Sequence, residues 1–262
     1  MISMKVSYYL IDPTGNTTIL VRTGVPIPEQ PALALSLMER EPSAEQVGFL
    51  SEDPVCDIAL RMAGGEFCGN ASMSAAVVRA WETGMKSGRV LVRASGAETP
   101  VSAEVCLGEQ GIWKGSVDMP EPRQIRTCPL EGAGERPVVF FDGIAHVIMK
   151  DPLPREEAQR LAPIWCRALG SDALGIMFPD PSFREMVPLV YVPAADTLFW
   201  ENSCASGTAA AGAFLAGERG GPVEASIRQP GGTLTVSVSA EGSVRLTGSV
   251  RILKKEEADL SV

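Results

Sequence analysis

Two alanine-rich segments place apolar residues at helical spacing, and each begins directly after a cysteine. The first follows Cys68 and reads GNASMSAAVVRAWETG; the second follows Cys204 and reads ASGTAAAGAFLAGERG. Each ends at a glycine 16 residues after its cysteine, Gly84 in the first case and Gly220 in the second. This spacing and the closing glycine predict two helices, each with a cysteine at its start.

The stretches around these helices alternate in the manner of β-strands. RVLVRASGAETPVSAEV, from Arg89, and EASIRQPGGTLTVSVSA, from Glu224, both alternate around a turn that contains glycine. Earlier in each half, a strand–turn–strand pattern precedes a further helix candidate. These segments are KVSYYLIDPTGNTTILVR and PEQPALALSLMER in the first half, and PVVFFDGIAHVIMK and PREEAQRLAPIWCRALG in the second.

The two halves match at a nearly constant offset. The cysteines lie 136 residues apart, and Arg93 and Gly96 match Arg228 and Gly231 at an offset of 135. This offset is about half the chain, which indicates an internal duplication rather than a short solenoid repeat. Met119–Pro137, rich in Pro, Gly and charge, is interpreted as a linker. We therefore predict a mixed α+β protein with two domains, 1–120 and 121–262, in which the last strands could complete the first domain. A single α/β domain with a coincidental repeat is the alternative.

Composition narrows the choice of partners. The 262 residues carry a net charge of −9, and the basic residues are dispersed, which disfavours nucleic acid and anionic membranes as partners. No apolar run reaches 18 residues, and the N-terminus lacks a secretory pattern, so a cytoplasmic protein is expected. The six cysteines form no CxxC pair and there is one histidine, so neither a metal site nor disulfide bonds are expected. A homodimer is left open.

The paired cysteines suggest a specific chemistry. A thiol at a helix N-terminus meets unpaired backbone amides and the positive end of the helix dipole, which favour the thiolate and should lower the pKa of both cysteines. Two opposed thiols can remove a proton from one face of a carbon acid and deliver a proton to the other. Cys68 and Cys204 are therefore the candidate acid/base pair, and no cofactor is required. The alternative is two buried structural cysteines.

Residues next to the cysteines are candidates for substrate binding. The small residues that follow each cysteine would let backbone amides approach a carboxylate closely; they are Gly69, Asn70, Ala205 and Ser206. Glu66 and Glu201 lie just before the cysteines and could orient the thiols, or simply favour a helix N-terminus. The other cysteines, Cys56, Cys106, Cys128 and Cys166, lack a matched context and are predicted to be structural.

The motifs FCGN and ENSCASGTAA resemble those of the diaminopimelate-epimerase-like family of cofactor-independent racemases. DPTGN, AEQVGF, SVDMP, AHVIM and RQPGGTLTV occur in the family's order along nearly the whole chain. The resemblance implies two pseudo-symmetric α+β halves, each a barrel-like sheet around a central helix, with the active site in the cleft between them. It also implies substrate-binding roles for Asn16, Gln46 and His146, although a turn residue and a packed core histidine remain alternatives.

Two departures from the diaminopimelate epimerases narrow the substrate. The arginine that helps to hold the distal end of diaminopimelate is missing before Cys204, and Gly-Asn-Pro-His is replaced by Gly143-Ile144-Ala145-His146. The chain looks most like the histidine racemases of opine-type (staphylopine-like) metallophore biosynthesis, which implies conversion of L-histidine to D-histidine, with Glu45 as a partner of the imidazole. An epimerase or isomerase of another substrate (diaminopimelate, hydroxyproline, an unsaturated dicarboxylate or several amino acids) and a non-catalytic amino-acid-binding protein are the alternatives.

Overall fold

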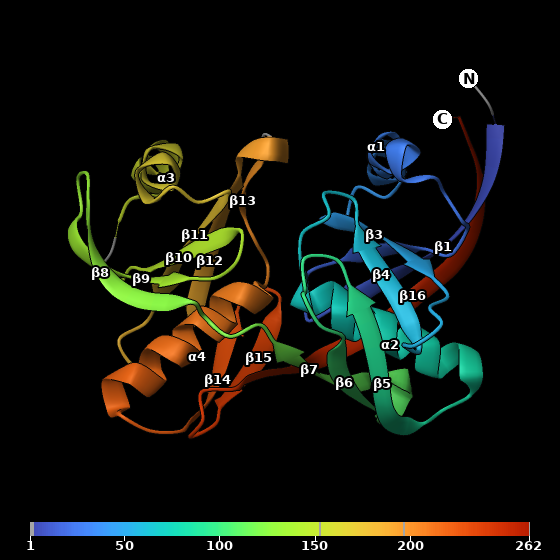
Figure 1. Ribbon diagram of the computed structural model, residues 1–262. Helices are drawn as coiled ribbons and strands as arrows, with labels where there is room; N and C mark the ends of the chain where they lie inside the picture. Colours follow the sequence, from blue (N-terminus) through green and yellow to red (C-terminus); the bar gives the residue numbers. More distant parts are fainter. Residues whose placement is uncertain (1–2, 152, 196, 262) are drawn as a thin grey trace. The chain divides into compact units, whose positions relative to one another are not determined.

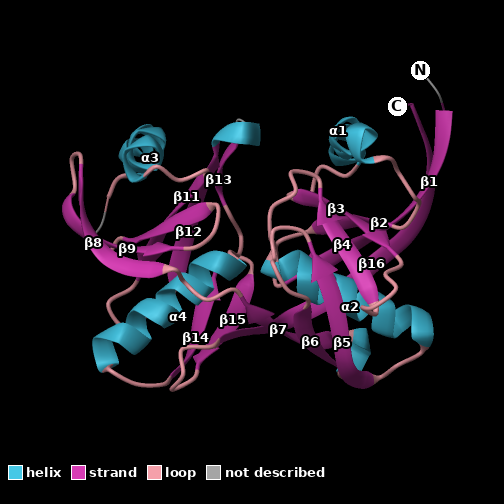
Figure 2. Cartoon of the chain, viewed as in Figure 1, coloured by secondary structure: helices cyan, strands magenta, loops and turns pink. Residues whose placement is uncertain are grey.

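The computed structural model describes residues 3–151, 153–195 and 197–261. The chain divides into two compact units (Figures 1 and 2). Unit 1 contains Met1–Asp118 and Thr247–Val262, and unit 2 contains Met119–Leu246. The chain therefore leaves unit 1, builds unit 2 and returns to unit 1 for its last strand.

Unit 1 is built on a closed β-barrel. Its strands follow the order β1-β2-β3-β4-β5-β6-β7-β16, and pairing of β1 with β16 closes the ring. The strands are β1 (Ser3–Pro13), β2 (Thr18–Val21), β3 (Gln46–Ser51), β4 (Ile58–Met62), β5 (Ser87–Ala94), β6 (Val101–Leu107), β7 (Trp113–Met119) and β16 (Val244–Ser261). The first three residues of β16, 244–246, belong to unit 2.

Helix α2 (Gly69–Thr83) packs against the strands of this barrel, and most of its residues are buried. Its small residues allow this burial: Gly69 to Val78 are all buried. The helix begins at Cys68 and ends at Gly84, which adopts the left-handed conformation with φ of 73°. Helix α1 (Gln30–Arg40), entered through the short 3-10 helix η1 (Ile27–Glu29), covers β3.

Unit 2 contains an open six-stranded sheet in the order β13-β12-β11-β10-β9-β8. Its strands are β8 (Gln124–Leu130), β9 (Gly134–Phe140), β10 (Ile144–Ile148), β11 (Ala173–Pro179), β12 (Met186–Val192) and β13 (Thr197–Trp200). Helix α3 (Arg155–Leu169) packs against β11 and β12, and a core around Trp165 fills the space beneath it.

Helix α4 (Ala205–Arg219) lies in unit 2 between this sheet and the hairpin of β14 (Val223–Gln229) and β15 (Gly232–Val238) (Figure 2). It begins at Cys204 and ends at Gly220, again in the left-handed conformation. The two short 3-10 helices that complete the described elements are η2 (Glu109–Gly111) and η3 (Pro193–Ala195).

The mixed α+β prediction is confirmed, and both predicted cysteine-led helices are present. The predicted barrel is confirmed in unit 1, but the six-stranded sheet of unit 2 does not close on itself. The linker interpretation of Met119–Pro137 is wrong. Most of this segment forms β8 and the first part of β9, which pair in antiparallel register from Gln124↔Phe140 to Leu130↔Gly134. Its Pro and charged residues fit there because β8 is an edge strand.

Candidate active site

Cys68 caps the N-terminus of α2 in unit 1. Its backbone is extended (φ −134°, ψ 114°), and its Sγ accepts a hydrogen bond from the Ala71 N–H at 3.4 Å. Such a cap is usually made by the oxygen of Ser, Thr, Asp or Asn. Here a sulfur occupies that position, so the thiol lies over the first-turn amides that would stabilise its anion.

A chain of hydrogen bonds connects Cys68 to three other predicted site residues. The Cys68 thiol donates to Gln46 Oε1 at 3.2 Å. The Gln46 amide nitrogen donates to Asn16 Oδ1 at 2.6 Å and to Thr18 Oγ1 at 2.8 Å. Asn16 Nδ2 in turn donates to Glu45 Oε2 at 2.7 Å. The structure therefore brings Cys68, Gln46, Asn16 and Glu45 together at one end of the barrel strands.

The turn between β1 and β2 fixes the position of Asn16. The Gly15 N–H donates to Asp12 Oδ1, and the Asn16 N–H donates to the Pro13 carbonyl at 3.3 Å. The left-handed conformation of Gly15, with φ of 89°, is needed for this turn. Asn16 is 4% exposed, so its amide is held inside the barrel end rather than on a mobile loop.

Glu66 lies apart from this network. Its carboxylate is exposed and turned toward Gly64, and its backbone carbonyl accepts a hydrogen bond from Ser95 Oγ at 2.8 Å. Gly69 and Asn70 form the first turn of α2 and are both buried. Their location is that expected of amides that receive a carboxylate.

Cys204 caps α4 in unit 2 and is 5% exposed. Burial raises the pKa of its thiol well above the ordinary value, and the neighbouring Glu201 carboxylate raises this pKa further. The Ser206 hydroxyl, 3.6 Å from Sγ, and the Gly207 N–H both lower the pKa but do not offset the burial. The Gly207 amide approaches the sulfur without forming a full cap hydrogen bond.

The expectation that helix position lowers the pKa of both thiols is therefore wrong for Cys204. The helix end stabilises a thiolate by a small amount, whereas removal from water destabilises it by a larger amount. Cys204 is consequently held as a thiol in the absence of substrate. Ala205, buried, and Ser206, half-buried, form the first turn of α4 after it.

His146, on β10, is fully buried in unit 2. Neither of its ring nitrogens has a hydrogen-bond partner among the described residues, and burial lowers its pKa to about 3. Its neighbours are apolar: the ring of Phe141 meets it edge-on with centroids 5.9 Å apart, and Gly175 faces it on β11. A Cβ on Gly175 would overlap His146 Nδ1, so the glycine makes room for the imidazole.

Met177 lies beside both His146 and the start of α4. A Cβ on Gly175 would lie 2.8 Å from Met177 Cε, and a Cβ on Gly207 would overlap the Met177 sulfur and lie 3.3 Å from Cys204 Sγ. Met177 and His146 therefore lie near the N-terminus of α4. Glu201 and Ser206 lie there as well, because both interact with the Cys204 thiol. The sequence did not single out Met177, since a methionine in a strand is ordinarily a core residue.

Sequence reasoning also missed Gln229 and Thr208, which bind the backbone of Cys204. Gln229 Oε1 accepts from the Cys204 N–H at 2.9 Å, and its amide nitrogen donates to Thr208 Oγ1 at 2.8 Å. The repeat of Arg93 and Gly96 at Arg228 and Gly231 is the available signal, although the glycines of QPGG by themselves indicate only a turn.

The remaining cysteines are free thiols. Cys56, Cys128 and Cys166 are buried, and burial raises the pKa of each. Cys106 is exposed on β6. The described residues contain no group of three or more His, Cys, Asp or Glu side chains arranged to hold a metal ion.

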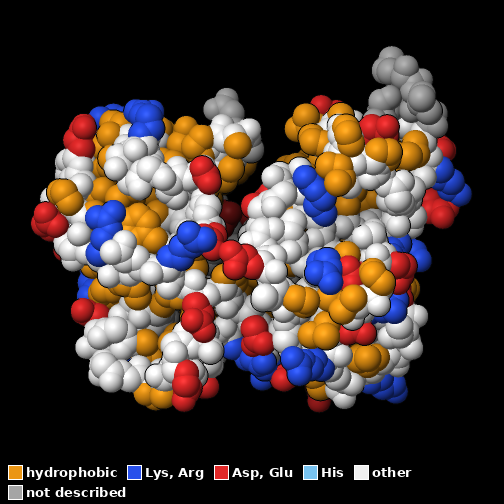
Figure 3. Space-filling view, viewed as in Figure 1, with side chains coloured by type: hydrophobic (Ala, Val, Ile, Leu, Met, Phe, Trp, Pro, Cys, Tyr) orange, Lys and Arg blue, Asp and Glu red, His pale blue; other side chains and the backbone are white. Residues whose placement is uncertain are grey.

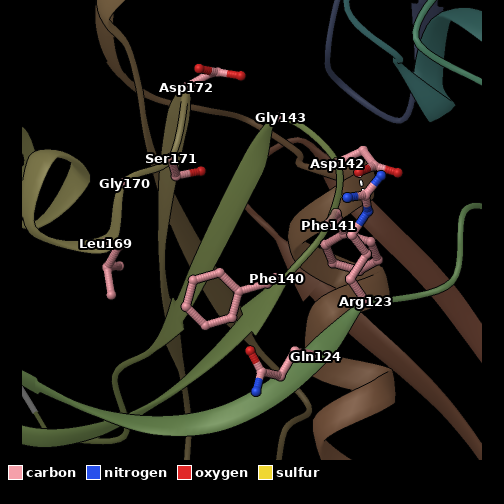
Figure 4. A pocket seen from close by; sticks show the side chains of 10 residues that line it. All are labelled: Arg123, Gln124, Phe140, Phe141, Asp142, Gly143, Leu169, Gly170, Ser171 and Asp172. Atoms are coloured by element: carbon pink, nitrogen blue, oxygen red, sulfur yellow. Dashed lines mark ion pairs between the residues drawn. The ribbon is translucent and has the colours of Figure 1, made fainter.

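A hollow of about 270 Å³ opens on unit 2 (Figure 4), and one of its lining residues, Phe141, packs against His146. It lies between the start of β8, the β9–β10 turn and the α3–β11 connection, and Arg123 pairs with Asp142 at its rim. None of its lining residues is fully buried and none is a candidate site residue. The candidate catalytic and substrate-binding residues therefore lie outside the lining of this hollow.

Comparison with known proteins identifies the family. The model of the family described as "Histidine racemase CntK N-terminal domain" matches residues 5–258. The chain belongs to the histidine racemase family of isomerases. The family assignment predicted from the two cysteine motifs is confirmed.

Individual relatives agree with this assignment. A histidine racemase of Staphylococcus aureus is 28% identical over 238 residues, which cover 86% of each chain. A histidine racemase of Fusobacterium nucleatum is 32% identical over 214 residues, which cover 78% of this chain and 79% of the relative.

Solved structures support the fold at lower identity. A hydroxyproline epimerase from Agrobacterium vitis with bound trans-4-hydroxy-L-proline has a TM-score of 0.72 at 14% identity, over 100% of this chain and 93% of that one. A predicted epimerase from Pseudomonas aeruginosa has a TM-score of 0.72 at 16% identity, over 98% and 100% of the two chains. A phenazine biosynthesis PhzF-family protein from Enterococcus faecalis has a TM-score of 0.65 at 18% identity, over 98% and 100%.

The part of the chain that the structure describes contains no helix long and apolar enough to cross a bilayer.

Proposed function

We propose that this protein interconverts L- and D-histidine without a cofactor, with Cys68 and Cys204 as its two acid/base groups. The observation that carries the proposal is the repeated one: in each unit a cysteine caps a buried helix, in a chain that belongs to the histidine racemase family. Racemisation requires a proton acceptor on one face of the α-carbon and a proton donor on the other.

In the proposed reaction, the thiolate of one cysteine takes the α-proton and becomes a thiol. The electron pair left on the α-carbon then takes the proton of the other thiol from the opposite face, and that sulfur becomes the thiolate. Protons and charge balance, and the reverse reaction uses the same groups in exchanged roles. Because its pKa is raised, Cys204 enters the cycle as the acid, which assigns the role of base to Cys68 in that direction.

The α-hydrogen of an amino acid is only weakly acidic, so the developing charge must be stabilised. We assign this to the first-turn amides at Gly69, Asn70, Ala205 and Ser206, which would donate hydrogen bonds to the substrate carboxylate. The burial of Cys204 would exclude water from its side of the substrate. Glu201, whose carboxylate interacts with the Cys204 thiol, would help to orient this thiol.

Glu45 is the proposed partner of the substrate imidazole. Its carboxylate is half-buried and oriented by Asn16, on the same network as Cys68. An acidic group at this place would favour a side chain with an N–H donor or a positive charge. The D-histidine produced would serve as a precursor of a metal-scavenging molecule of the opine type.

The test is exchange of the α-hydrogen of L-histidine in deuterated water, with no added cofactor, followed by chiral chromatography. Cys68→Ser and Cys204→Ser should each lower the rate by about 100-fold or more, the contribution typical of a lost acid/base group. Cys106→Ser, which changes an exposed thiol of unit 1, is the matched control and should retain full activity. Full racemisation by either active-site variant would refute the two-thiol mechanism.

Substrate choice is tested separately. A panel of histidine, diaminopimelate, hydroxyproline and other amino acids, each followed by chiral chromatography, should show the fastest inversion with histidine. If another amino acid of the panel is inverted fastest, the two-thiol mechanism would stand but histidine would not be the preferred substrate. Calorimetric binding of histidine without any exchange would indicate a binding protein.

A further inference from the structure

The hairpin tip between β14 and β15 is attached to the segment that carries Cys204. Gln229 and Gly232 pair across this tip, which leaves Pro230 and Gly231 as its turn. The Gly231 N–H donates to the Asn202 carbonyl at 2.8 Å, two residues before the cysteine. The turn therefore fixes the segment that leads into α4.

Gln229 supplies a contact that the helix itself lacks. In a capping box, a Glu or Gln at the third helical position reaches back to the backbone N–H of the capping residue. In α4 that third position is Gly207, and a Cβ there would overlap the Met177 sulfur. The capping-box position therefore offers no acceptor to the Cys204 N–H, and Gln229, 25 residues further along the chain, accepts from it at 2.9 Å.

Thr208 closes the arrangement on the other side of Cys204. The Gln229 amide nitrogen donates to Thr208 Oγ1 at 2.8 Å, and Thr208 Oγ1 donates to the Cys204 carbonyl at 2.7 Å. All three residues are at most 5% exposed. Gln229 thus fixes both the N–H and, through Thr208, the C=O of the residue whose sulfur is proposed to react.

The contact of the hairpin turn, but not the Gln229 cap, has a counterpart at the matching place in unit 1. Ser95, in the turn after β5, donates from Oγ to the Glu66 carbonyl at 2.8 Å. Glu66 precedes Cys68 by two residues, as Asn202 precedes Cys204. Gly96 packs so closely that a Cβ there would lie 2.8 Å from the carbonyl carbon of Glu66. In each unit, a hairpin turn holds the carbonyl two residues before the cysteine.

We infer that Gln229 is a positioning residue that acts as a remote cap and keeps the Cys204 thiol buried, in the position from which it is proposed to react with the substrate. The inference about catalysis rests on the proposed function, whereas the inference about the thiol's position does not. Loss of Gln229 would leave the Cys204 N–H unpaired and release the segment toward water. Because burial is the main cause of the raised thiol pKa, release would both expose the sulfur and make it a better nucleophile.

The experiment uses the whole chain and measures alkylation of Cys204 relative to Cys68 with iodoacetamide at pH 8.5, resolved by peptide mass spectrometry. Gln229→Met removes both hydrogen bonds at nearly constant volume and should raise the Cys204/Cys68 ratio at least fivefold. Gln229→Glu retains an acceptor for the Cys204 N–H and should stay within twofold of the original protein. Ser226→Ala, which removes an exposed hydroxyl on the same strand, should leave the ratio unchanged.

Racemisation gives the second readout. Gln229→Met should lower kcat about tenfold and change KM by less than threefold, and Gln229→Glu should recover part of the loss. If the alkylation ratio changes as expected but the original protein does not racemise histidine, the remote cap would stand and the proposed function would be refuted. An unchanged ratio in Gln229→Met, or an equal rise in all three variants, would overturn the inference.

If Gln229→Met does not fold, Thr208→Val provides the same test. This variant preserves the shape of the side chain but removes the hydroxyl that joins Gln229 to the Cys204 carbonyl. A rise in the Cys204/Cys68 ratio supports the inference, and an unchanged ratio in the folded variant overturns it.

Discussion

At the residue scale, burial determines the protonation state of two titratable side chains of unit 2. Cys204 and His146 are both nearly inaccessible, and in each case the charged form is disfavoured. The one histidine contributes no atom to the face drawn in Figure 3. Unit 2 therefore holds a neutral imidazole and a neutral thiol at neutral pH.

The buried histidine predicts a specific pH dependence of stability. The folded-state pKa of His146 is about 3 and the unfolded value is 6.5, so the unfolded chain binds a proton first as the pH falls. The free energy of unfolding should therefore fall by about 2 kcal/mol between pH 7 and pH 5 on account of this residue.

Urea unfolding of the original protein and of His146→Leu, compared between pH 5 and 7, checks this. The leucine variant should show a flatter profile, because it lacks the titrating group. Carboxylates titrate mostly below this range and act on both proteins alike. Parallel profiles would mean that His146 is protonated as readily in the folded protein as in the unfolded chain.

The carboxylate of Glu201 predicts a shift in the reactivity of Cys204. Glu201→Gln removes a negative charge and replaces a charged hydrogen-bond acceptor by a neutral one, and both the charge and the bond to the carboxylate raise the pKa of the thiol, so the pKa of Cys204 should fall. The pH profile of Cys204 alkylation should accordingly move to lower pH. Glu66→Gln is the control, because Glu66 lies two residues before Cys68, in the other unit, and its carboxylate is exposed; it should leave the Cys204 profile in place.

At the element scale, the two cysteine-led helices share their length and both of their ends. Helices α2 and α4 each have 15 residues, a cysteine N-cap and a left-handed glycine at the C-terminus. Their small residues are required by close packing against strands. In α4, a Cβ on Gly212 would lie 2.5 Å from Val236 Cγ2 on β15. By contrast, helix α1 leaves Leu35 exposed, and hydrophobic atoms gather over it in Figure 3.

Two glycines of α4 should respond in opposite directions to the same substitution. Gly212→Ala overpacks the contact with Val236 and should destabilise the protein by about 1–3 kcal/mol. Gly217→Ala, on the exposed side with nothing within 4 Å, should stabilise it by about 0.5–1 kcal/mol through better helix propensity. Thermal unfolding of both variants is the measurement. Stabilisation by Gly212→Ala would show that α4 can move away from β15.

At the scale of the whole molecule, the last strand of the chain belongs to the same barrel as the first. Strand β16 pairs with β1 from Ser3↔Ser261 to Pro13↔Val250, and this pairing closes the barrel of unit 1. All of unit 2 therefore lies, in the sequence, between the two strands whose pairing closes unit 1. Such long-range pairing is slow to form, because a large loop must close first.

Removal of the last strand should unfold unit 1 selectively. A chain that ends at Leu246 leaves β1 without its pairing to β16, and the backbone amides of β1 and β2 should lose their protection from hydrogen exchange while the six-stranded sheet of unit 2 retains its protection. A peptide of residues 247–262 added in trans should restore protection to β1. Retained protection in β1 of the truncated chain would show that the barrel is stable without its closing strand.

The sequence by itself determined the local features: the cysteine-led helices, their terminal glycines, most strands and the family. Apolar spacing, turn residues and short motifs encode these over a few neighbouring positions. Only the tertiary structure decided that unit 2 has an open sheet, that Met119–Pro137 contributes β8 and part of β9, and that Gln229 binds the Cys204 backbone. It also decided that the pKa of Cys204 is raised rather than lowered. Each of these depends on which distant residues meet and how much water they exclude, and neither burial nor long-range pairing is written in a local pattern.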